Sequence, residues 1–286
     1  MQKRTCHAAS ILLFFSIPIW MFWVAPAFTK MSALFRYEAK IFSEDNFYDQ
    51  ARGNFGPLID SQTLFYYEID AQKNGVYIIK NIFNVKTPSG NPIFMVERRY
   101  GIDPKTGTHV AGYGDHNREG YLFAPRFLNK GQGYTYWHIN YDNPAHMEFQ
   151  GVEKILGLTV YRYETDYHAD QTKNLGHLPG VPEKRGVNLD INLQTWIEPI
   201  SGYLVKYEDN ATAYYYDRAT GERIHPWNRF HNQYTKESLI DTIREASSAK
   251  YNILMFERLI PVLLFIAGIC MAILGFKKIM PIKDHS

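Results

Sequence analysis

The stretch Gly157–Glu164, GLTVYRYE, decides the fold class, because its side chains alternate in character from one residue to the next. Leu158 and Val160 are aliphatic, whereas Tyr161 and Tyr163 fall on the opposite parity. Successive side chains of a β-strand point to opposite faces of the sheet. The stretch therefore predicts a strand with an aliphatic face and a tyrosine-rich face, one of them buried and the other available for binding.

Similar runs, rich in aromatic and β-branched residues, recur on both sides of this stretch. They are Leu64–Asp70, Gly75–Val85, Ile93–Arg99, Gly133–His138, Met147–Glu153, Asn188–Glu198, Gly202–Tyr207 and Ala211–Tyr216. Turn residues separate them, as in Thr87-Pro88-Ser89-Gly90. The spacing predicts a mainly β fold, a curved antiparallel sheet of half-barrel or sandwich-like form, built as a meander. Asp166–Gly186 lacks the pattern and predicts a long surface loop.

Two apolar stretches bracket the β region, Ile11–Phe28 and Leu259–Phe276. Each has 18 residues without a charge, near the lower limit for a helix that crosses a hydrocarbon core of about 30 Å. A cleavable signal peptide is the alternative for the first stretch, since Ala25-Pro26-Ala27 fits the small-x-small pattern of cleavage sites. A buried core helix is the alternative for the second.

Basic residues flank the outer ends of both stretches: Lys3 and Arg4 at one end, and Lys277, Lys278 and Lys283 at the other. Short basic flanks stay on the cytoplasmic side. We therefore expect a two-span cell-membrane protein with both termini cytoplasmic and an extracytoplasmic main domain. The predicted segments are a tip at 1–10, a span or signal anchor at 11–28, a β domain at 29–234, a juxtamembrane helix at 235–258, a span at 259–276 and a tail at 277–286.

The juxtamembrane segment changes to a helical period. Ser238 with Asp241 fits a capping box, and Leu239, Ile243 and Ala246 fall on one helical face. Pro261 stands near the start of the second apolar stretch, where a proline kinks a helix.

Composition excludes several classes of function. The formal net charge is +2, which provides no basic excess for a phosphate backbone, so nucleic acid is not an expected partner. The two cysteines, Cys6 and Cys270, both lie at the membrane ends. The β domain therefore cannot hold a disulfide, a thiolate-bound zinc or a cysteine nucleophile.

The sequence contains no catalytic or nucleotide-binding motif of the GxSxG, HExxH, P-loop or GxGxxG type. Tyr113–Gly120 is polar and framed by glycines; with His109, or with His168 and Asp170, it is a candidate metal site, against the simpler interpretation of a polar turn. The run Ser43–Asn46 with Asp49 is a candidate cation site through oxygen ligands, but it lacks EF-hand spacing and favours an Asx-type turn. We predict no catalytic residue, no metal and no cofactor, and hence no enzyme.

Aromatic residues are abundant, with 21 tyrosines and 18 phenylalanines. They either fill a β core or line a concave apolar groove for a lipid or another amphipathic ligand. If there is a groove, the candidate ligand-binding residues on the aromatic strand faces are Tyr134, Tyr136, Trp137, Tyr161, Tyr163 and Trp196.

Four segments in order carry a resemblance to a known family: Gly120–Arg126, Tyr134–Trp137, Phe149–Tyr163 and Trp196–Asp209. Together they resemble the PorA-like envelope family, whose layout is an N-terminal span, a β-rich outer domain and a C-terminal span. The family name implies a porin. About 60 residues also resemble, more loosely, the half-barrels of the LolA and LppX type, which curve an antiparallel sheet around an apolar cavity.

These features predict a membrane-anchored binding or sensing module without catalysis, whose ligand is a lipid or an amphipathic molecule. Two alternatives remain open, a channel component formed by oligomerised helices and a scaffold within a membrane complex. The expected partners are the lipid bilayer, the amphipathic ligand, and a membrane protein or further copies of the chain.

Overall fold

The computed structural model describes residues 2–173 and 184–276. Its helical elements, including two short π-helices (η), are α1 (Gln2–Ile19), η1 (Trp20–Val24), α2 (Ala25–Thr29), α3 (Lys236–Leu254), η3 (Met255–Leu259) and α4 (Ile260–Phe276). Its strands are β1 (Arg36–Asp49), β2 (Asn54–Phe55), β3 (Ile59–Lys73), β4 (Val76–Lys86), β5 (Pro92–Ile102), β6 (His109–Gly114), β7 (Tyr134–His138), β8 (Asn143–Ile155), β9 (Leu158–Asp170), β10 (Arg185–Glu198), β11 (Tyr203–Asp217) and β12 (Arg223–Tyr234).

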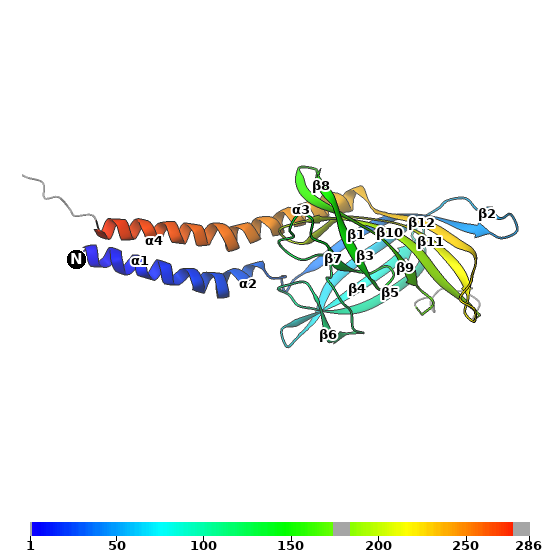
Figure 1. The fold of residues 1–286 in the computed structure, drawn as a ribbon, viewed down its shortest axis with the longest axis horizontal. Coiled ribbons are helices and arrows are strands. Elements are labelled where there is room, and N and C mark those ends of the chain that lie inside the picture. Colours follow the sequence, from blue (N-terminus) through cyan, green and yellow to red (C-terminus); the bar gives the residue numbers. More distant parts are fainter. Residues whose placement is uncertain (1, 174–183, 277–286) are drawn as a thin grey trace, which may run out of the picture. The chain divides into compact units, whose positions relative to one another are not determined.

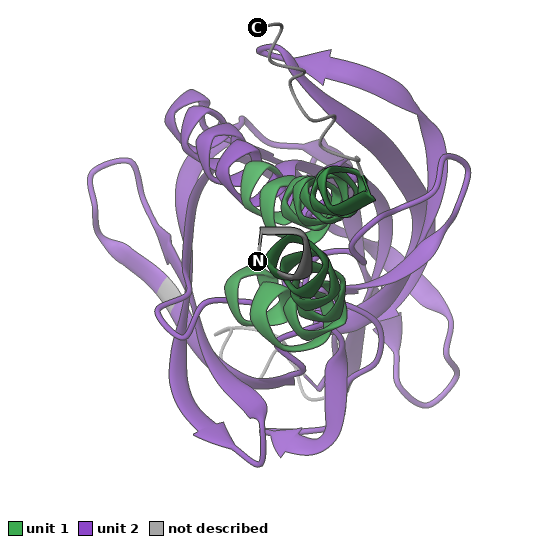
Figure 2. Ribbon diagram, turned by 90° about the vertical axis from the view of Figure 1, so that its left-hand side faces the viewer, with its two compact units in different colours: residues 1–30, 251–286 green, residues 31–250 purple. Residues whose placement is uncertain are grey.

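The chain divides into two compact units (Figure 2). Unit 1 combines the two ends, Met1–Lys30 and Tyr251–Ser286, and unit 2 is Met31–Lys250. The predicted tail at 277–286, with Lys277, Lys278 and Lys283, lies outside the described residues.

The strands of unit 2 form one open antiparallel sheet in the order β6-β5-β4-β3-β1-β12-β11-β10-β9-β8-β7, with β2 paired to β1 (Figure 1). The mainly β prediction is confirmed, but the sheet holds two meanders rather than one. The first runs from β1 to β6 and the second from β7 to β12, and they are joined where β1 pairs with β12. The sheet curves, so that one face turns inward (Figure 2).

The segment 115–133 leads from one edge strand, β6, to the other, β7. Within it, Tyr121 forms isolated bridges to Thr108 and to Tyr136, and the His109 amide donates to the Gly120 carbonyl, so the segment around Tyr121 ties the two edges together. No continuous ladder closes the sheet among the described residues.

The inner face of the sheet carries the main core, which is dominated by tyrosine. Tyr67, Tyr100, Tyr136, Tyr163 and Tyr207 are all less than 2% exposed. Strand β9 contributes Tyr163 to this core and packs Tyr161 against it, which confirms the predicted tyrosine-rich face. That face is therefore the interior of the unit.

The aliphatic face of β9 packs under α3. Leu158 and Val160 form a second cluster with Trp196, Val205 and Ala246. Leu239 and Ile243 pack against this cluster, as the helical period predicted. Thr242 of α3 also donates its hydroxyl proton to the Val205 carbonyl, at 2.6 Å.

The start of α3 differs from the predicted capping box. The helix begins at Lys236, and the Thr235 hydroxyl accepts the Ser238 amide proton, so Thr235 is the N-cap. Ser238 lies one turn inside, and its hydroxyl accepts the Lys40 amide proton of β1 at 2.7 Å. The serine thus ties the helix to the sheet.

In unit 1 both apolar segments are helical. The helices that contain them, Thr5–Thr29 and Lys236–Phe276, are long and apolar enough to span a membrane. Pro261 is preceded by the π-helix η3, in which the Ile260 amide donates to the Met255 carbonyl. Proline has no N–H, so the Phe256 carbonyl lacks its backbone donor. Trp20 Nε1 donates to that carbonyl at 2.8 Å, which satisfies the oxygen freed by the proline.

The predicted loop Asp166–Gly186 is shorter than expected. Strand β9 continues to Asp170 and β10 begins at Arg185, while residues 174–183 lie outside the described residues. The side chains at the end of β9 are polar, which hid the strand from a hydrophobicity pattern.

Candidate functional site

An apolar cavity of about 280 Å³ opens on the inner face of the sheet. Its walls come from both meanders, with apolar side chains that include Val85 of β4, Val96 of β5, Leu189 of β10, and Trp227 and Phe230 of β12. The volume is close to the lower limit of ordinary ligand pockets, about 300 Å³. The cavity therefore has room for a small ligand or for one end of a longer one.

Three large apolar side chains that line the cavity remain exposed to solvent. Phe47 is 44% exposed, and Ile59 and Ile93 are each 51% exposed. They come from β1, β3 and β5. Contiguous exposed apolar surface next to a cavity is typical of an entrance for an apolar molecule.

Asp45 is the one carboxylate among the described residues that line this cavity. Its Oδ2 accepts a hydrogen bond from the Ser61 hydroxyl at 3.4 Å, and no ion pair reaches it in the described parts of the chain. Burial raises its pKa from 3.8 to about 6, and the Ser61 hydrogen bond offsets this only in part. The group is thus mainly ionised at neutral pH.

Arg98 is the only cation among the described lining residues, and it is held by other partners. Its Nη1 donates to the Ile139 carbonyl at 2.6 Å, and its Nε lies 3.9 Å from Asp142 Oδ2. Asp142 is bound more closely by Arg118, whose Nε is 2.9 Å from Oδ1. Burial raises the pKa of Asp142, but the hydrogen bond and charge of Arg118 outweigh it and hold the pKa below its usual value.

Arg118 belongs to the polar segment Tyr113–Gly120, for which the sequence left a metal site or a turn open. Its side chain is 1% exposed, pairs with Asp115 at 2.5 Å and lies over the Tyr100 ring at 4.3 Å. His168 pairs instead with Asp190, at 2.6 Å. The described residues include no group of three or more His, Cys, Asp or Glu that could hold a metal ion.

A buried polar network lies beside the cavity. His138 Nε2 is 2.6 Å from the Tyr207 hydroxyl, Nδ1 contacts the Tyr167 hydroxyl, and Asn140 donates to Tyr207 Oη at 2.7 Å. Burial lowers the pKa of His138 to about 3, so the ring is neutral and donates from one nitrogen while accepting at the other. The network fixes the wall of the cavity.

The six residues predicted to bind a ligand do not line either of the hollows described here. Tyr134, Tyr136, Trp137 and Tyr163 are buried in the inner core, and Tyr161 packs against it. Trp196 lies on the opposite face, in the cluster under α3, where its Nε1 donates to Glu153 at 2.7 Å. The structure brings five of the six into or against one core cluster, and their role in binding stays a prediction.

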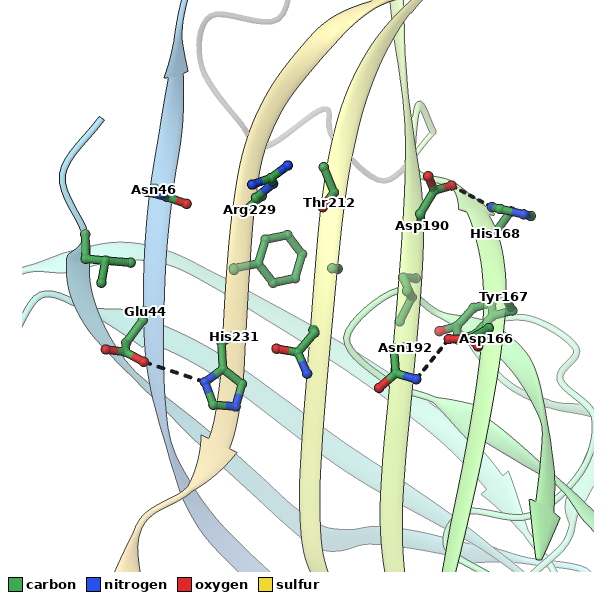
Figure 3. Close-up of a pocket in the computed structure, with 15 residues that line it drawn as sticks. Glu44, Asn46, Asp166, Tyr167, His168, Asp190, Asn192, Thr212, Arg229 and His231 are labelled. Atoms are coloured by element: carbon green, nitrogen blue, oxygen red, sulfur yellow. Dashed lines mark hydrogen bonds and ion pairs between the residues drawn. The ribbon is translucent and has the colours of Figure 1, made fainter. Parts of the chain in front are cut away.

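The outer face of the sheet has a second hollow, of about 570 Å³, across β1, β12, β11, β10 and β9 (Figure 3). Strand register aligns its polar side chains in two rows. One row is Glu44, His231, Asn210, Asn192 and Asp166, and the next is Asn46, Arg229, Thr212, Asp190 and His168.

Each carboxylate of this outer groove has a partner within the groove. Glu44 lies 3.6 Å from His231, Asn192 donates to Asp166 at 2.9 Å, and Asp190 pairs with His168. The dashed contacts in Figure 3 show these pairs. We interpret the groove as the solvated face of the sheet.

Sequence reasoning missed the cavity residue Asp45. The run Ser43–Asn46 was expected to be a turn, but the structure places it within β1, paired with Ser61–Ile59 of β3 and with β12. In a strand, Ser43 and Asp45 face inward while Glu44 and Asn46 face outward. The signal that could have located the site is the Ser-x-Asp-x-Phe alternation through Phe47.

The class of this protein is defined by a curved, open antiparallel sheet with an apolar cavity. In the sequence, this sheet lies between two candidate membrane helices. The chain belongs to the PorA family: the model of the family described as Porin PorA matches residues 86–277. The match includes most of the sheet and α4.

No curated protein matches the chain. Among solved structures, one similar chain is described as a putative exported protein with a YmcC-like fold, from Bacteroides fragilis. The two share 11% identity with a TM-score of 0.29, over 71% of this chain and 96% of that one. A likeness at this level carries no argument about function.

Proposed function

We propose that this PorA-family chain is a membrane-anchored extracytoplasmic binding protein for a lipid or another amphipathic ligand. The observation that carries the proposal is the apolar cavity on the inner face of the sheet, with Phe47, Ile59 and Ile93 exposed at its edge. In this proposal both helices anchor the chain, both termini are cytoplasmic, and the sheet lies outside.

The cavity favours an amphipathic ligand over a wholly polar one. Its described lining is apolar along β4 and β10, where Val85, Val187 and Leu189 face it. Burying apolar ligand surface there gains roughly 25 cal/mol for each Å² removed from water. The polar residues Asp45 and Asn140 provide a place for a polar head.

The proposal is binding without catalysis. Asp45 has no second carboxylate and no histidine beside it among the described residues that line the cavity. General acid–base chemistry needs a partner within hydrogen-bond reach of the reacting group. His138, the closest candidate, is already engaged with two tyrosine hydroxyls.

Native mass spectrometry of the full chain, released gently from detergent, tests the proposal. We expect a bound mass of lipid size on the wild type. Thr63→Phe should abolish it, because Thr63 is 4% exposed and lines the cavity from β3. Gln62→Phe is the matched control, since the neighbouring side chain is exposed on the other face of the same strand. A bare wild-type monomer, or equal loss in both variants, would contradict the proposal.

The family description as a porin favours a channel as the second candidate. In that case further copies of the chain would assemble through the apolar helices, since the outer face of the sheet carries two polar rows where a membrane barrel needs an apolar band. Planar-bilayer recording of the pure protein tests this candidate. Discrete conductance steps would support it, and a silent bilayer together with a monomeric mass would remove it.

A further inference from the structure

The head group that the cavity accepts can be inferred from Asp45, and this inference rests on the proposed function. Strand register brackets Asp45 between Phe230 of β12 and Ile59 of β3, which are directly opposite it on either side. Residues opposite each other in an antiparallel pair share a face of the sheet. A carboxylate thus stands between two apolar side chains on the cavity wall.

The charge of Asp45 has no counter-ion among the described residues. Arg98, the only cation of the described lining, is engaged with the Ile139 carbonyl and Asp142. The one hydrogen bond to Asp45, from Ser61, is long at 3.4 Å. An ionised carboxylate removed from water without a partner is costly, whereas an opposite charge brought to it is strongly favoured.

Two further acceptors belong to the same lining. The side-chain oxygens of Asn140 and Asn228 are buried and have no hydrogen-bond partner in the part of the chain that the structure describes. Asn228 is the diagonal neighbour of Asp45, because it lies opposite Phe47 on the same face. The amide nitrogen of Asn140 is committed to Tyr207, so its oxygen is the group left over. Asp45, Asn140 and Asn228 therefore provide oxygen acceptors on the cavity lining.

We propose that the cavity binds an amphipathic amine, whose ammonium group pairs with Asp45 and whose apolar body lies against Leu189, Trp227 and Phe230. An ammonium carries three donors and no acceptor, which matches a carboxylate and two amide oxygens that line the same cavity. A carboxylate or phosphate head would be repelled by Asp45. A neutral alcohol would leave the carboxylate without a counter-ion.

Isothermal titration of the full chain in nanodiscs, with empty nanodiscs as the blank, tests this inference with three probes of equal chain length. Octylamine should bind saturably at pH 7.5, octanol at least tenfold more weakly, and octanoate not at all. Asp45→Asn should weaken octylamine binding at least tenfold and leave octanol binding unchanged. Glu44→Gln removes a neighbouring carboxylate that faces the outer groove, and should leave all three unchanged.

The pH profile of the wild type tests the same group without a substitution. The other titratable or charged described residues that face the cavity are Arg98 and Tyr141. A guanidinium keeps its charge in this range, and burial raises the pKa of Tyr141 well above its usual value. With the pKa of Asp45 at about 6, octylamine affinity should fall about tenfold from pH 7.5 to pH 5.

Either of two titration results would overturn the inference. One is equal affinity for octylamine and octanol with no effect of Asp45→Asn. The other is the absence of saturable octylamine binding. Neither result decides the proposed function, which depends on the bound mass of lipid size and on the loss of that mass in Thr63→Phe. A bound lipid without a basic nitrogen would support the proposed function and contradict the amine proposal.

Discussion

Replacing Asp209 by asparagine is expected to stabilise the protein at neutral pH and to have little effect in acid. Asp209 lies on β11 with its side chain fully buried, and its Oδ2 accepts the Tyr141 hydroxyl proton at 2.6 Å. Burial raises its pKa from 3.8 to about 6, although the Tyr141 hydrogen bond acts in the opposite direction. The ionised carboxylate is therefore disfavoured in the folded state.

The sign of the pH dependence follows from this raised pKa. Between about pH 4 and pH 6 the folded protein binds the proton and the unfolded chain does not, so the contribution of Asp209 to stability falls as pH rises. Above pH 6 the full cost is present. At 1.36 kcal/mol per pKa unit it is on the order of 3 kcal/mol.

Asp209→Asn removes this cost while keeping an oxygen for Tyr141. The new amide N–H₂ needs acceptors, which reduces the gain to about 1–3 kcal/mol at pH 7.5. Urea unfolding of the full chain in mild detergent, followed by tryptophan fluorescence, measures the difference. A thermal scan should show a rise of roughly 2–4 °C for each kcal/mol. At pH 4 the gain should vanish.

Glu208→Gln is the matched control, because the adjacent carboxylate faces outward and pairs with Lys206 at 3.0 Å. Burial raises the pKa of Glu208, but Lys206 outweighs it and leaves the pKa lowered. Its loss should destabilise the protein at pH 7.5, by less than about 1 kcal/mol, and the difference should close as pH falls. A destabilised Asp209→Asn at pH 7.5, or a gain of equal size at both pH values, would refute the reasoning.

Three further substitutions test the packing, each measured as a free energy of unfolding by urea titration. Trp196→Ala should cost about 3–5 kcal/mol by emptying the cluster under α3, and a cost below 1 kcal/mol would show that the helix does not depend on it. Arg118→Met should cost about 3–5 kcal/mol, because it leaves Asp142 buried without its closest cation; an unchanged stability would mean that Arg98 takes over. Gly202→Ala should destabilise the protein more than Gly221→Ala. Both glycines have positive φ, but only at Gly202 would an added Cβ meet a backbone oxygen, at 2.3 Å. Equal losses of stability in the two variants would leave backbone strain as the sole cause.

The sequence predicted the strands well because alternation in β9 and its neighbours is local information. It predicted the face of Trp196 less well, for a reason that lies in the tertiary packing of α3. Alternation along β10 puts Trp196 on the face opposite Leu193 and Ile197, which belong to the inner core. Thr195, Trp196, Ile197 and Glu198 are all buried in succession because the main core covers one face of the strand and α3 covers the other, and this cover by α3 cannot be seen in the strand's own residues.

Asp45 shows a second limit of local reasoning. Ser-Glu-Asp-Asn has the composition of a turn, but pairing with both β3 and β12 holds it extended. Strand β12 is far away in sequence, so this pairing could not be predicted from neighbouring residues. The cavity depends on the same long-range pairing, because β1 and β12 bring the two meanders together.

The position of the cavity across this seam has a thermodynamic consequence. Its walls come from β1 and β3–β5 on one side and from β10–β12 on the other, so a ligand seated there contacts both meanders. Separating β1 from β12 destroys the site, and the separated meanders then cannot bind the ligand. A ligand that binds only the joined sheet stabilises it by about 2.7 kcal/mol at a concentration of 100 times Kd. If octylamine stabilises the wild type but not Asp45→Asn, head-group recognition is linked to the joining of the two meanders. If the stabilisation survives the substitution, the amine binds elsewhere.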